Sequence, residues 1–409
     1  MQQQNKVRVE RKLVLFLIHT PFGISFFDKI AKTRAARIYS EFSTYLMPLI
    51  TALAVFLFVV AAIGMFSNSA AREGVRDLGP QANLLIPGLN PLLPWTYGWI
   101  ALVVTIVIHE AGHGIVARVY NAKVESTGLV LFLIFPIGAF VNIQREELEK
   151  TPLKHKCSIL TAGPLNNMIL AAASLIALYY VMSTLSPLPG FDEESSVIVA
   201  DIRPGSLAEQ IGIAQGSKIQ SIDGQKIENL NDVGEVLRST EGKDIEVIWE
   251  DDNGDVFAKS GQNENSLLGV SIRMEASPSL VLEGYKGAFH FNSLDPRVYL
   301  SLLTPPTLNI IPVPYSDTMA SKYESDIFGS YFPMISNMLF WLWFINFNVG
   351  IFNALPIGPF DGGQLYASLI ENKLKSARRQ INAAAVSNTI TFIFIAIVLL
   401  LIAGPYLLR

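Results

Sequence analysis

Two histidines and a glutamate stand at a spacing that suits metal-assisted hydrolysis. The run His109-Glu110-Ala111-Gly112-His113 places its imidazoles four residues apart, so that on a helix they lie on one face and can bind the same metal ion. A zinc ion held in this way lowers the pKa of a bound water to about 7, and Glu110, beside the ligands, can accept the proton of that water. The run therefore predicts a zinc site in which Glu110 is the general base.

Asp361 is the best candidate for a third ligand, because two histidines leave a catalytic zinc ion one protein ligand short. It is the first charged residue after the uncharged stretch that begins at Ile327, and it follows an Asn/Pro/Gly-rich run at 353–360. The structural alternative is an aspartate in an ordinary turn before Gly362-Gly363. An ionisable side chain at the end of a membrane helix is costly without a partner, which favours the metal role.

The segments that must position these residues are typical of membrane helices. Only 16% of the 409 residues are charged, whereas soluble proteins carry about 25%. The charges leave gaps that can each hold a span of roughly 20 residues, the length that crosses a bilayer. This composition excludes an ordinary soluble enzyme, a disordered chain and a nucleic-acid binder. Five spanning helices are expected, at about 42–66, 96–120, 157–184, 334–352 and 385–407.

The placement of the histidine motif inside such a span adds weight to the metal role. No Asp, Glu, Lys or Arg occurs in residues 78–108, immediately before His109. Ionisable groups inside a membrane segment are rarely incidental. The alternative is a polar network between helices, and Gly112 and Gly114 also permit close helix packing.

The distribution of charge predicts an orientation. Residues 192–275 contain 18 acidic and 7 basic residues, a net charge of −11, and the rest of the chain contains 17 acidic and 24 basic residues, a net charge of +7. The basic residues are concentrated in three loops that fall on one side when the helices alternate, which identifies that side as cytoplasmic. The acidic segment is then expected to be extracytoplasmic, in a multi-pass protein of the cell membrane.

Three further segments complete the predicted organisation. Residues 1–41 are expected to be a cytoplasmic or membrane-associated segment that is retained in the mature protein. The apolar run 126–143 contains Pro136 and Gly138, and a membrane-dipping β-hairpin or a re-entrant segment fits it better than a sixth span. The Pro- and aromatic-rich residues 276–333 are expected to form a loop on the membrane surface. Between these lie two parts of the membrane core, 42–184 and 334–409.

Three motifs together resemble the site-2 protease family of intramembrane zinc metalloproteases, peptidase family M50. Residues 109–113 match the HExxH of that family, and 353–362 match its NxxPxxxxDG, with Phe360 where leucine is more usual. Residues 163–167 match the glycine-to-asparagine spacing of its third core helix. The resemblance covers roughly residues 42–185 and 334–380, and the order of the motifs and their membrane placement agree with it.

The resemblance implies a set of roles for these residues. One zinc ion per chain would be bound by His109, His113 and Asp361, with Glu110 as the general base. Asn167 and Asn353 would lie near the zinc, where a carboxamide could bind the substrate backbone or stabilise an oxyanion. The alternatives are an interhelix hydrogen bond for Asn167 and a cap on a helix end for Asn353.

The acidic segment 192–275 resembles a PDZ domain of the kind found in bacterial proteases. Its landmarks are the run 201–209 after the first strand, the run 216–224 with Ser217 where aspartate is usual, and a final strand that starts near Leu267. In such a domain one loop offers backbone N–H groups to a peptide carboxylate and the strand is extended by the peptide. The residues that would bind the peptide are Leu267, Leu268, Gly269 and Val270.

The predicted fold is therefore a polytopic α-helical membrane protein with about five transmembrane helices, a membrane-associated β-hairpin and an inserted α/β PDZ-like domain. The predicted function is zinc-dependent hydrolysis of peptide bonds in transmembrane substrates, with the lipid bilayer and a peptide or protein ligand of the PDZ-like domain as further partners. Two alternatives remain: a non-catalytic membrane scaffold that presents the PDZ-like domain, and an ion transporter.

Overall fold

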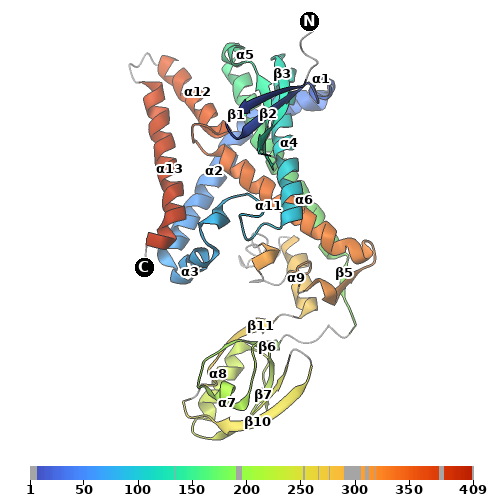
Figure 1. The fold of residues 1–409 in the computed structure, drawn as a ribbon, viewed down its shortest axis with the longest axis vertical. Coiled ribbons are helices and arrows are strands. Elements are labelled where there is room, and N and C mark those ends of the chain that lie inside the picture. The colour runs from blue at the N-terminus through green and yellow to red at the C-terminus, as the bar shows by residue number, and fades with distance from the viewer. Residues whose placement is uncertain are drawn as a thin grey trace. The chain divides into compact units, whose positions relative to one another are not determined.

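The computed structural model describes residues 7–133, 135–189, 196–251, 254–265, 267–275, 277–289, 305–308, 313–317, 319–376 and 382–407. Its elements are labelled in Figure 1. The chain divides into two compact units. Unit 1 consists of residues 1–178 and 337–409, and unit 2 consists of residues 179–336.

Within the described residues, five helices are long and apolar enough to cross a membrane, which agrees with the predicted number. They are apolar around most of their circumference because their outer faces meet hydrocarbon rather than water. Thr33 caps the first of them, since its hydroxyl accepts a hydrogen bond from the N–H of Ala36. The five are α2 (Arg34–Ser67), α4 (Trp95–Val119), α6 (Leu153–Ser183), α11 (Phe332–Ala354) and α13 (Ala383–Leu407).

Shorter helices lie before and between the spans of unit 1. They are α1 (Ile24–Ala31), α3 (Ser69–Leu78), α5 (Arg145–Lys150) and α12 (Asp361–Ser376), with a 3₁₀ turn at Pro80–Asn83. Helix α1 packs on α4, where Phe27 lies against Gly114 and Asp28 forms an ion pair of 2.5 Å with Arg118. Residues 24–31 are thereby tied to the helix that carries the histidine motif.

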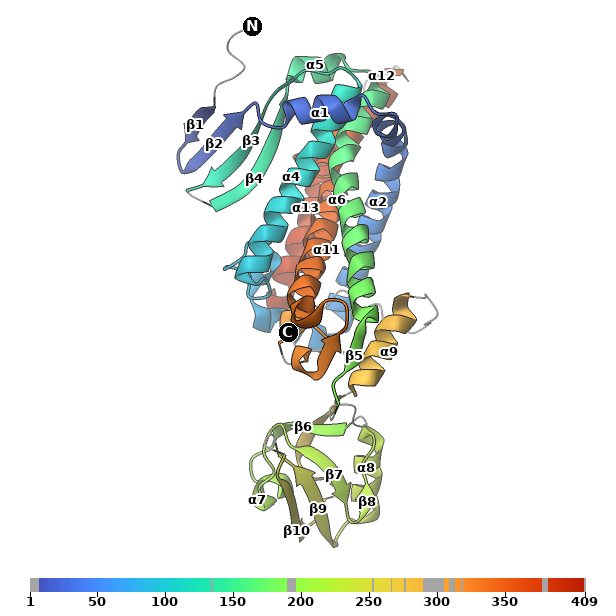
Figure 2. The same ribbon diagram turned by 90° about the vertical axis from the view of Figure 1, so that its right-hand side faces the viewer.

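The predicted hairpin at 126–143 forms, and it belongs to a larger sheet. Strands β3 (Val124–Phe132) and β4 (Phe135–Ile143) are antiparallel, and the sheet has the order β1-β2-β3-β4. The two added strands are β1 (Arg8–Lys12) and β2 (Leu15–Thr20). Figure 2 shows this sheet beside α4. Because β4 ends the strand order, one of its edges is unpaired within the described sheet, and this strand is the one that packs along α4.

Unit 2 contains a small α/β fold between residues 196 and 275. Its strands are β6 (Ser196–Ile202), β7 (Lys218–Ile222), β8 (Gln225–Lys226), β9 (Asp244–Glu250), β10 (Val256–Gln262) and β11 (Val270–Glu275). The main path has the order β10-β9-β7-β6-β11, with β8 paired to β7. Helices α7 (Leu207–Ile211) and α8 (Leu230–Ser239) close the core, which includes Ile219, Val247 and Trp249.

Part of the predicted loop at 276–333 lies outside the described residues, and the described part contains a helix and a short strand. Residues Pro278–Phe289 form helix α9, which packs against β5 (Leu185–Pro187). Strand β5 pairs with β12 (Tyr323–Ser325), and short 3₁₀ turns occupy Pro306–Leu308, Ala320–Lys322 and Gly329–Tyr331. The prediction of a loop is therefore wrong for 278–289, because a proline at the first helical position starts a helix as readily as it ends one.

Candidate functional site

The two histidines and the aspartate meet in unit 1. His109 and His113 project from one face of α4, and Asp361 is the first residue of α12. The Nε2 atoms of the two imidazoles are 3.2 Å apart, and the Oδ2 atom of Asp361 lies 3.1 Å from that of His109 and 3.3 Å from that of His113. All three residues are at most 9% exposed. Among the described residues this is the cluster that could hold a metal ion.

The hydrogen bonds around the two rings orient their lone pairs toward one point. The Nδ1 atom of His113 lies 2.7 Å from the carbonyl oxygen of Ile159, which can only accept a hydrogen bond. Nδ1 must then carry the proton, so Nε2 holds a lone pair. The Asn167 amide lies 3.0 Å from Nδ1 of His109. If its oxygen faces the ring, that oxygen gains the partner it otherwise lacks among the described residues, and His109 adopts the same tautomer.

The resulting arrangement fits a zinc ion. Two imidazole lone pairs and a carboxylate oxygen converge within 3.3 Å of one another, and such a set repels itself unless a cation lies between its members. In a tetrahedral site with zinc–ligand distances of about 2.0–2.1 Å, ligand atoms are roughly 3.3 Å apart. The Oδ2 atom of Asp361 is also buried without a donor in hydrogen-bond geometry among the described residues. Both the spacing and the donor types therefore suit zinc.

Two glycines make the room that the cluster occupies. A Cβ at Gly163 of α6 would lie 2.3 Å from Nε2 of His113 and 2.7 Å from Nε2 of His109. A Cβ at Gly112 of α4 would lie 2.5 Å from the carbonyl oxygen of Ala162. Helices α4 and α6 approach so closely here that only glycine fits at either position. Gly163 of the glycine-to-asparagine motif thus has a steric role beside the metal ligands.

Glu110 lies on α4 between the ligands and is bound to the β-sheet. Its Oε2 atom accepts a hydrogen bond of 2.9 Å from the N–H of Val141 in β4. Val141 pairs with Thr127 of β3 on one side of β4. Its N–H bond to Glu110 therefore leaves from the other edge of β4, which is turned toward α4. The sheet therefore holds the carboxylate next to the cluster.

The two asparagines named by sequence occupy different surroundings. Asn167 is fully buried and contacts His109, as described above. Asn353 donates to the carbonyl oxygen of Val349, one turn earlier in its own helix, at 3.0 Å. No hydrogen bond from Asn353 to the cluster is present among the described residues. Its place near the site stays a prediction.

Two polar residues near the cluster were not singled out by the sequence. The Asn166 amide donates to the carbonyl oxygen of Ile108, adjacent to His109, at 3.0 Å. The Tyr39 hydroxyl of α2 donates to Oδ1 of Asn166 at 2.7 Å. Asn166 lies inside a recognised motif and could have been suspected, but Tyr39 belongs to no motif and carries no sequence signal.

The residues predicted to bind a peptide line a groove in unit 2. The groove has a volume of 740 Å³, within the range of roughly 300–1,000 Å³ that is usual for small-ligand sites. One wall is α8, with Leu230 and Val233, and the other is β11, which starts at Val270, with the preceding residues Leu267–Gly269. Leu268 is buried, whereas Leu267 is exposed. Because β11 ends the strand order, its second edge is unpaired within the described sheet.

Comparison with known proteins identifies a matching peptidase family and several relatives. The family model described as Peptidase family M50 matches residues 97–401. An uncharacterized protein of Methanocaldococcus jannaschii is 25% identical over 284 residues, which cover 68% of this chain and 71% of that protein. A Clostridium perfringens protein named as a candidate zinc metalloprotease is 29% identical over 334 residues, 73% of this chain and 94% of its own. The regulator of sigma-W protease RasP of Bacillus subtilis is 24% identical over 239 residues, 54% and 51% of the two chains.

Proposed function

Because the chain belongs to peptidase family M50, we propose that it is a zinc-dependent endopeptidase that cleaves transmembrane proteins within or near the bilayer. The observation that carries this proposal is the convergence of His109, His113 and Asp361 beside the carboxylate of Glu110. A scaffold or an ion transporter would need no such ligand set with an adjacent general base. The five membrane helices explain how the site reaches substrates inside the membrane.

In the proposed mechanism the chain supplies the metal ligands, the general base and the strand edge that binds the substrate. A zinc ion at the cluster would polarise the scissile carbonyl and acidify a water molecule. Glu110 takes a proton from the attacking water as its oxygen adds to the carbonyl carbon. Glu110 then delivers that proton to the amide nitrogen as the C–N bond breaks. Its hydrogen bond to Val141 keeps the carboxylate oriented for both transfers.

The unpaired edge of β4 offers a place for the substrate. A transmembrane helix must unwind before cleavage, because helical hydrogen bonds cover its carbonyl groups. An extended segment can then pair with a sheet edge through its main chain. The edge of β4 lies along α4 and is bonded to Glu110 through Val141. We assign it the task of presenting the extended peptide to the base.

Removal of the metal tests the proposed function directly. Purified wild-type protein in detergent should contain one zinc ion per chain and should cleave a model transmembrane substrate. A chelator should abolish cleavage, and added Zn²⁺ should restore it, because the ligands remain in place without covalent change. Metal analysis and gel-resolved cleavage give the two measurements. A protein without stoichiometric zinc, or one whose cleavage survives complete metal removal, would contradict the proposal.

The fold of residues 196–275 supports a second function, as a PDZ-like peptide-binding domain on the extracytoplasmic side. An apolar groove lies between a helix and a strand with an unpaired edge, which is the geometry for adding a peptide strand. The carbonyl groups of Leu268 and Gly269 already accept bonds from Ala208 and Arg203. We assign the N–H groups of the same loop to a peptide carboxylate. The excess of basic residues in the opposite loops supports the extracytoplasmic placement.

A substitution at the groove tests this assignment. Leu230 is 42% exposed and lines the groove, so Leu230→Glu should leave the fold intact. It should weaken binding of a peptide with an apolar C-terminal residue and a free carboxylate roughly tenfold, because the added charge repels the carboxylate and removes apolar contact. Fluorescence anisotropy with the full-length protein gives the affinity. Val256→Glu, on the exposed β10 edge, is the matched control. Equal binding of the amidated peptide would contradict carboxylate recognition.

A further inference from the structure

The position of Asp361 depends on the turn that precedes it. Residues 355–360 join α11 to α12, and the first turn of α12 is pressed against them. A Cβ at Gly362 would lie 2.4 Å from the carbonyl oxygen of Ala354, and a Cβ at Gly363 would lie 2.1 Å from that of Ile357 and 2.7 Å from the nitrogen of Gly358. Because the two backbone segments are in such close contact, one cannot shift without the other. A displacement of residues 354–358 would therefore displace Asp361.

Two threonines from other membrane helices bind this same backbone. The Thr51 hydroxyl of α2 donates a hydrogen bond of 2.8 Å to the carbonyl oxygen of Ala354. The Thr391 hydroxyl of α13 accepts one of 3.0 Å from the N–H of Gly358. The two bonded backbone groups are those against which Gly362 and Gly363 lie. The turn is thus held from two sides at the points that set the place of Asp361.

The Thr51 hydroxyl donates across to another helix, and the Thr391 hydroxyl accepts from the turn. In a membrane helix a threonine hydroxyl commonly bonds to the carbonyl group one turn earlier. Thr389, two residues before Thr391 on the same helix, does so with Ala385 at 2.9 Å. Thr51, which is only 9% exposed, bonds across to Ala354. An interhelix bond of this kind fixes one helix against another.

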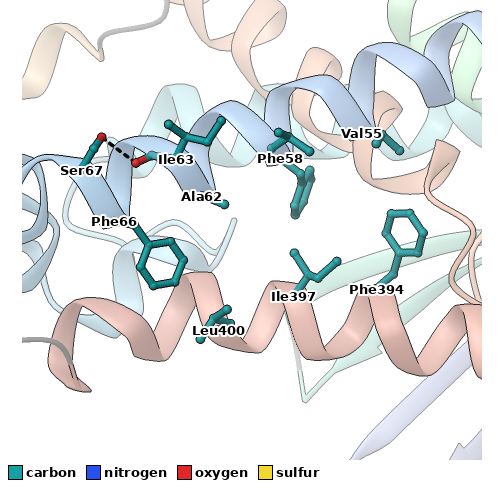
Figure 3. Close-up of a pocket in the computed structure, with 10 residues that line it drawn as sticks. Val55, Phe58, Ala62, Ile63, Phe66, Ser67, Phe394, Ile397 and Leu400 are labelled. Carbon is teal, nitrogen blue, oxygen red and sulfur yellow. Dashed lines mark hydrogen bonds between the residues drawn. The ribbon is translucent and has the colours of Figure 1, made fainter.

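Beyond the threonines, α2 and α13 stay close, and Met65 of α2 lies against Gly404 of α13. They enclose an apolar groove of 560 Å³ that starts at Val55, one turn after Thr51, and at Phe394, three residues after Thr391. Figure 3 shows the side chains of both helices facing each other across it, from these two residues to Phe66 and Leu400. Helix α13 packs on α12, α2 and α3, and its most apolar stretch is only 11% buried. Among the described residues, the threonine hydrogen bonds join these two helices to the backbone that precedes Asp361.

We propose that Thr51 and Thr391 are positioning residues that hold the Asp361 carboxylate in place for the metal ion. This inference rests on the zinc site of the proposed function. Neither side chain touches the metal ligands. Each acts through one backbone group of the turn, and the loss of either contact frees the turn on one side. The expected consequence is a weaker and less regular metal site rather than a general loss of the fold.

The test compares valine and serine variants at both positions in the full-length protein. Thr51→Val and Thr391→Val keep the shape of the side chain and remove the hydroxyl, so zinc affinity should fall roughly tenfold, the lower range seen when supporting partners of metal ligands are lost. Thr51→Ser and Thr391→Ser keep the hydroxyl and should restore wild-type affinity. Competition with a chromogenic chelator measures the affinity. Thr389→Val, on the same helix, is the matched control.

A second readout separates positioning from packing. In the Co²⁺-substituted protein the visible absorption of the metal reports its ligand geometry, and it should change in both valine variants but not in Thr389→Val. Unchanged zinc affinity and an unchanged Co²⁺ spectrum in Thr391→Val, with only a lower melting temperature, would overturn the inference. Should Thr51→Val fail to fold, Thr391→Val decides, because its contact lies at a more exposed place. A wild-type protein that binds neither metal would instead overturn the proposed function.

Discussion

Replacing Glu110 with glutamine is expected to lower cleavage of a transmembrane substrate by roughly 10²- to 10⁴-fold, the usual contribution of a general acid–base group. Glutamine cannot accept the proton of the attacking water. Its carbonyl oxygen can still accept the hydrogen bond from Val141, so the local geometry should persist. His109, His113 and Asp361 are untouched, and the variant should keep its zinc. Parallel measurements of zinc content and cleavage rate would show a loss of activity at constant metal.

Glu125 provides the matched control for this substitution. It is a second carboxylate on the same sheet, in β3, and it accepts a hydrogen bond of 3.1 Å from the Asn142 amide. Glu125→Gln removes a charge from the sheet without touching the cluster, and cleavage should stay near the wild-type rate. If Glu110→Gln cleaved as fast as Glu125→Gln, Glu110 would not be the base. If it also lost zinc, its effect on cleavage would have a structural origin.

Replacing Gly163 with alanine is the second change with a large expected effect. The new methyl group would fall 2.3 Å from Nε2 of His113 and 2.7 Å from Nε2 of His109. These are the atoms that carry the lone pairs, so the methyl group would lie in the space of the metal ion or push the imidazoles apart. We expect zinc content to fall below one tenth of the wild-type value and cleavage to be lost with it. Metal analysis of the purified, monodisperse variant is the measurement.

Gly64→Ala is the control, because a Cβ at Gly64 of α2 meets nothing within 4 Å. Alanine is the better helix former by about 1 kcal/mol, so this variant should fold and bind zinc as the wild type does. A Gly163→Ala protein that retained a full complement of zinc and normal activity would mean that the ion does not lie between the two imidazoles and Gly163.

The candidate metal ligands were the part of the site that could be predicted from the sequence. The four-residue spacing of His109 and His113 is a local property of a helix, and the isolation of Asp361 at the end of an uncharged stretch is visible without a structure. The structure brings these three together. Their roles as ligands remain a prediction, as does that of Glu110, until zinc and cleavage are measured.

Features that depend on distant pairing were not predictable. The N-terminal strands β1 and β2 were expected to be part of a plain membrane-associated segment. Strand β2 pairs with β3 in a register that joins Leu15 to Phe132, and strand formation depends on such neighbours more than on local propensity. The same holds for Thr51 and Thr391. A threonine hydroxyl in an apolar helix can bond to its own helix or to another, and only the three-dimensional structure shows which backbone group is its partner.

The cluster also has a consequence for the biosynthesis of the protein. His109 and His113 leave the ribosome early, whereas Asp361 and the turn that holds it follow some 250 residues later, and Thr391 later still. Zinc in sites of this kind binds tightly only when all its ligands are present. A nascent or prematurely truncated chain can therefore insert its first helices without carrying a complete hydrolytic centre. On the proposed function, the hydrolytic centre is complete only after Asp361 has been synthesised.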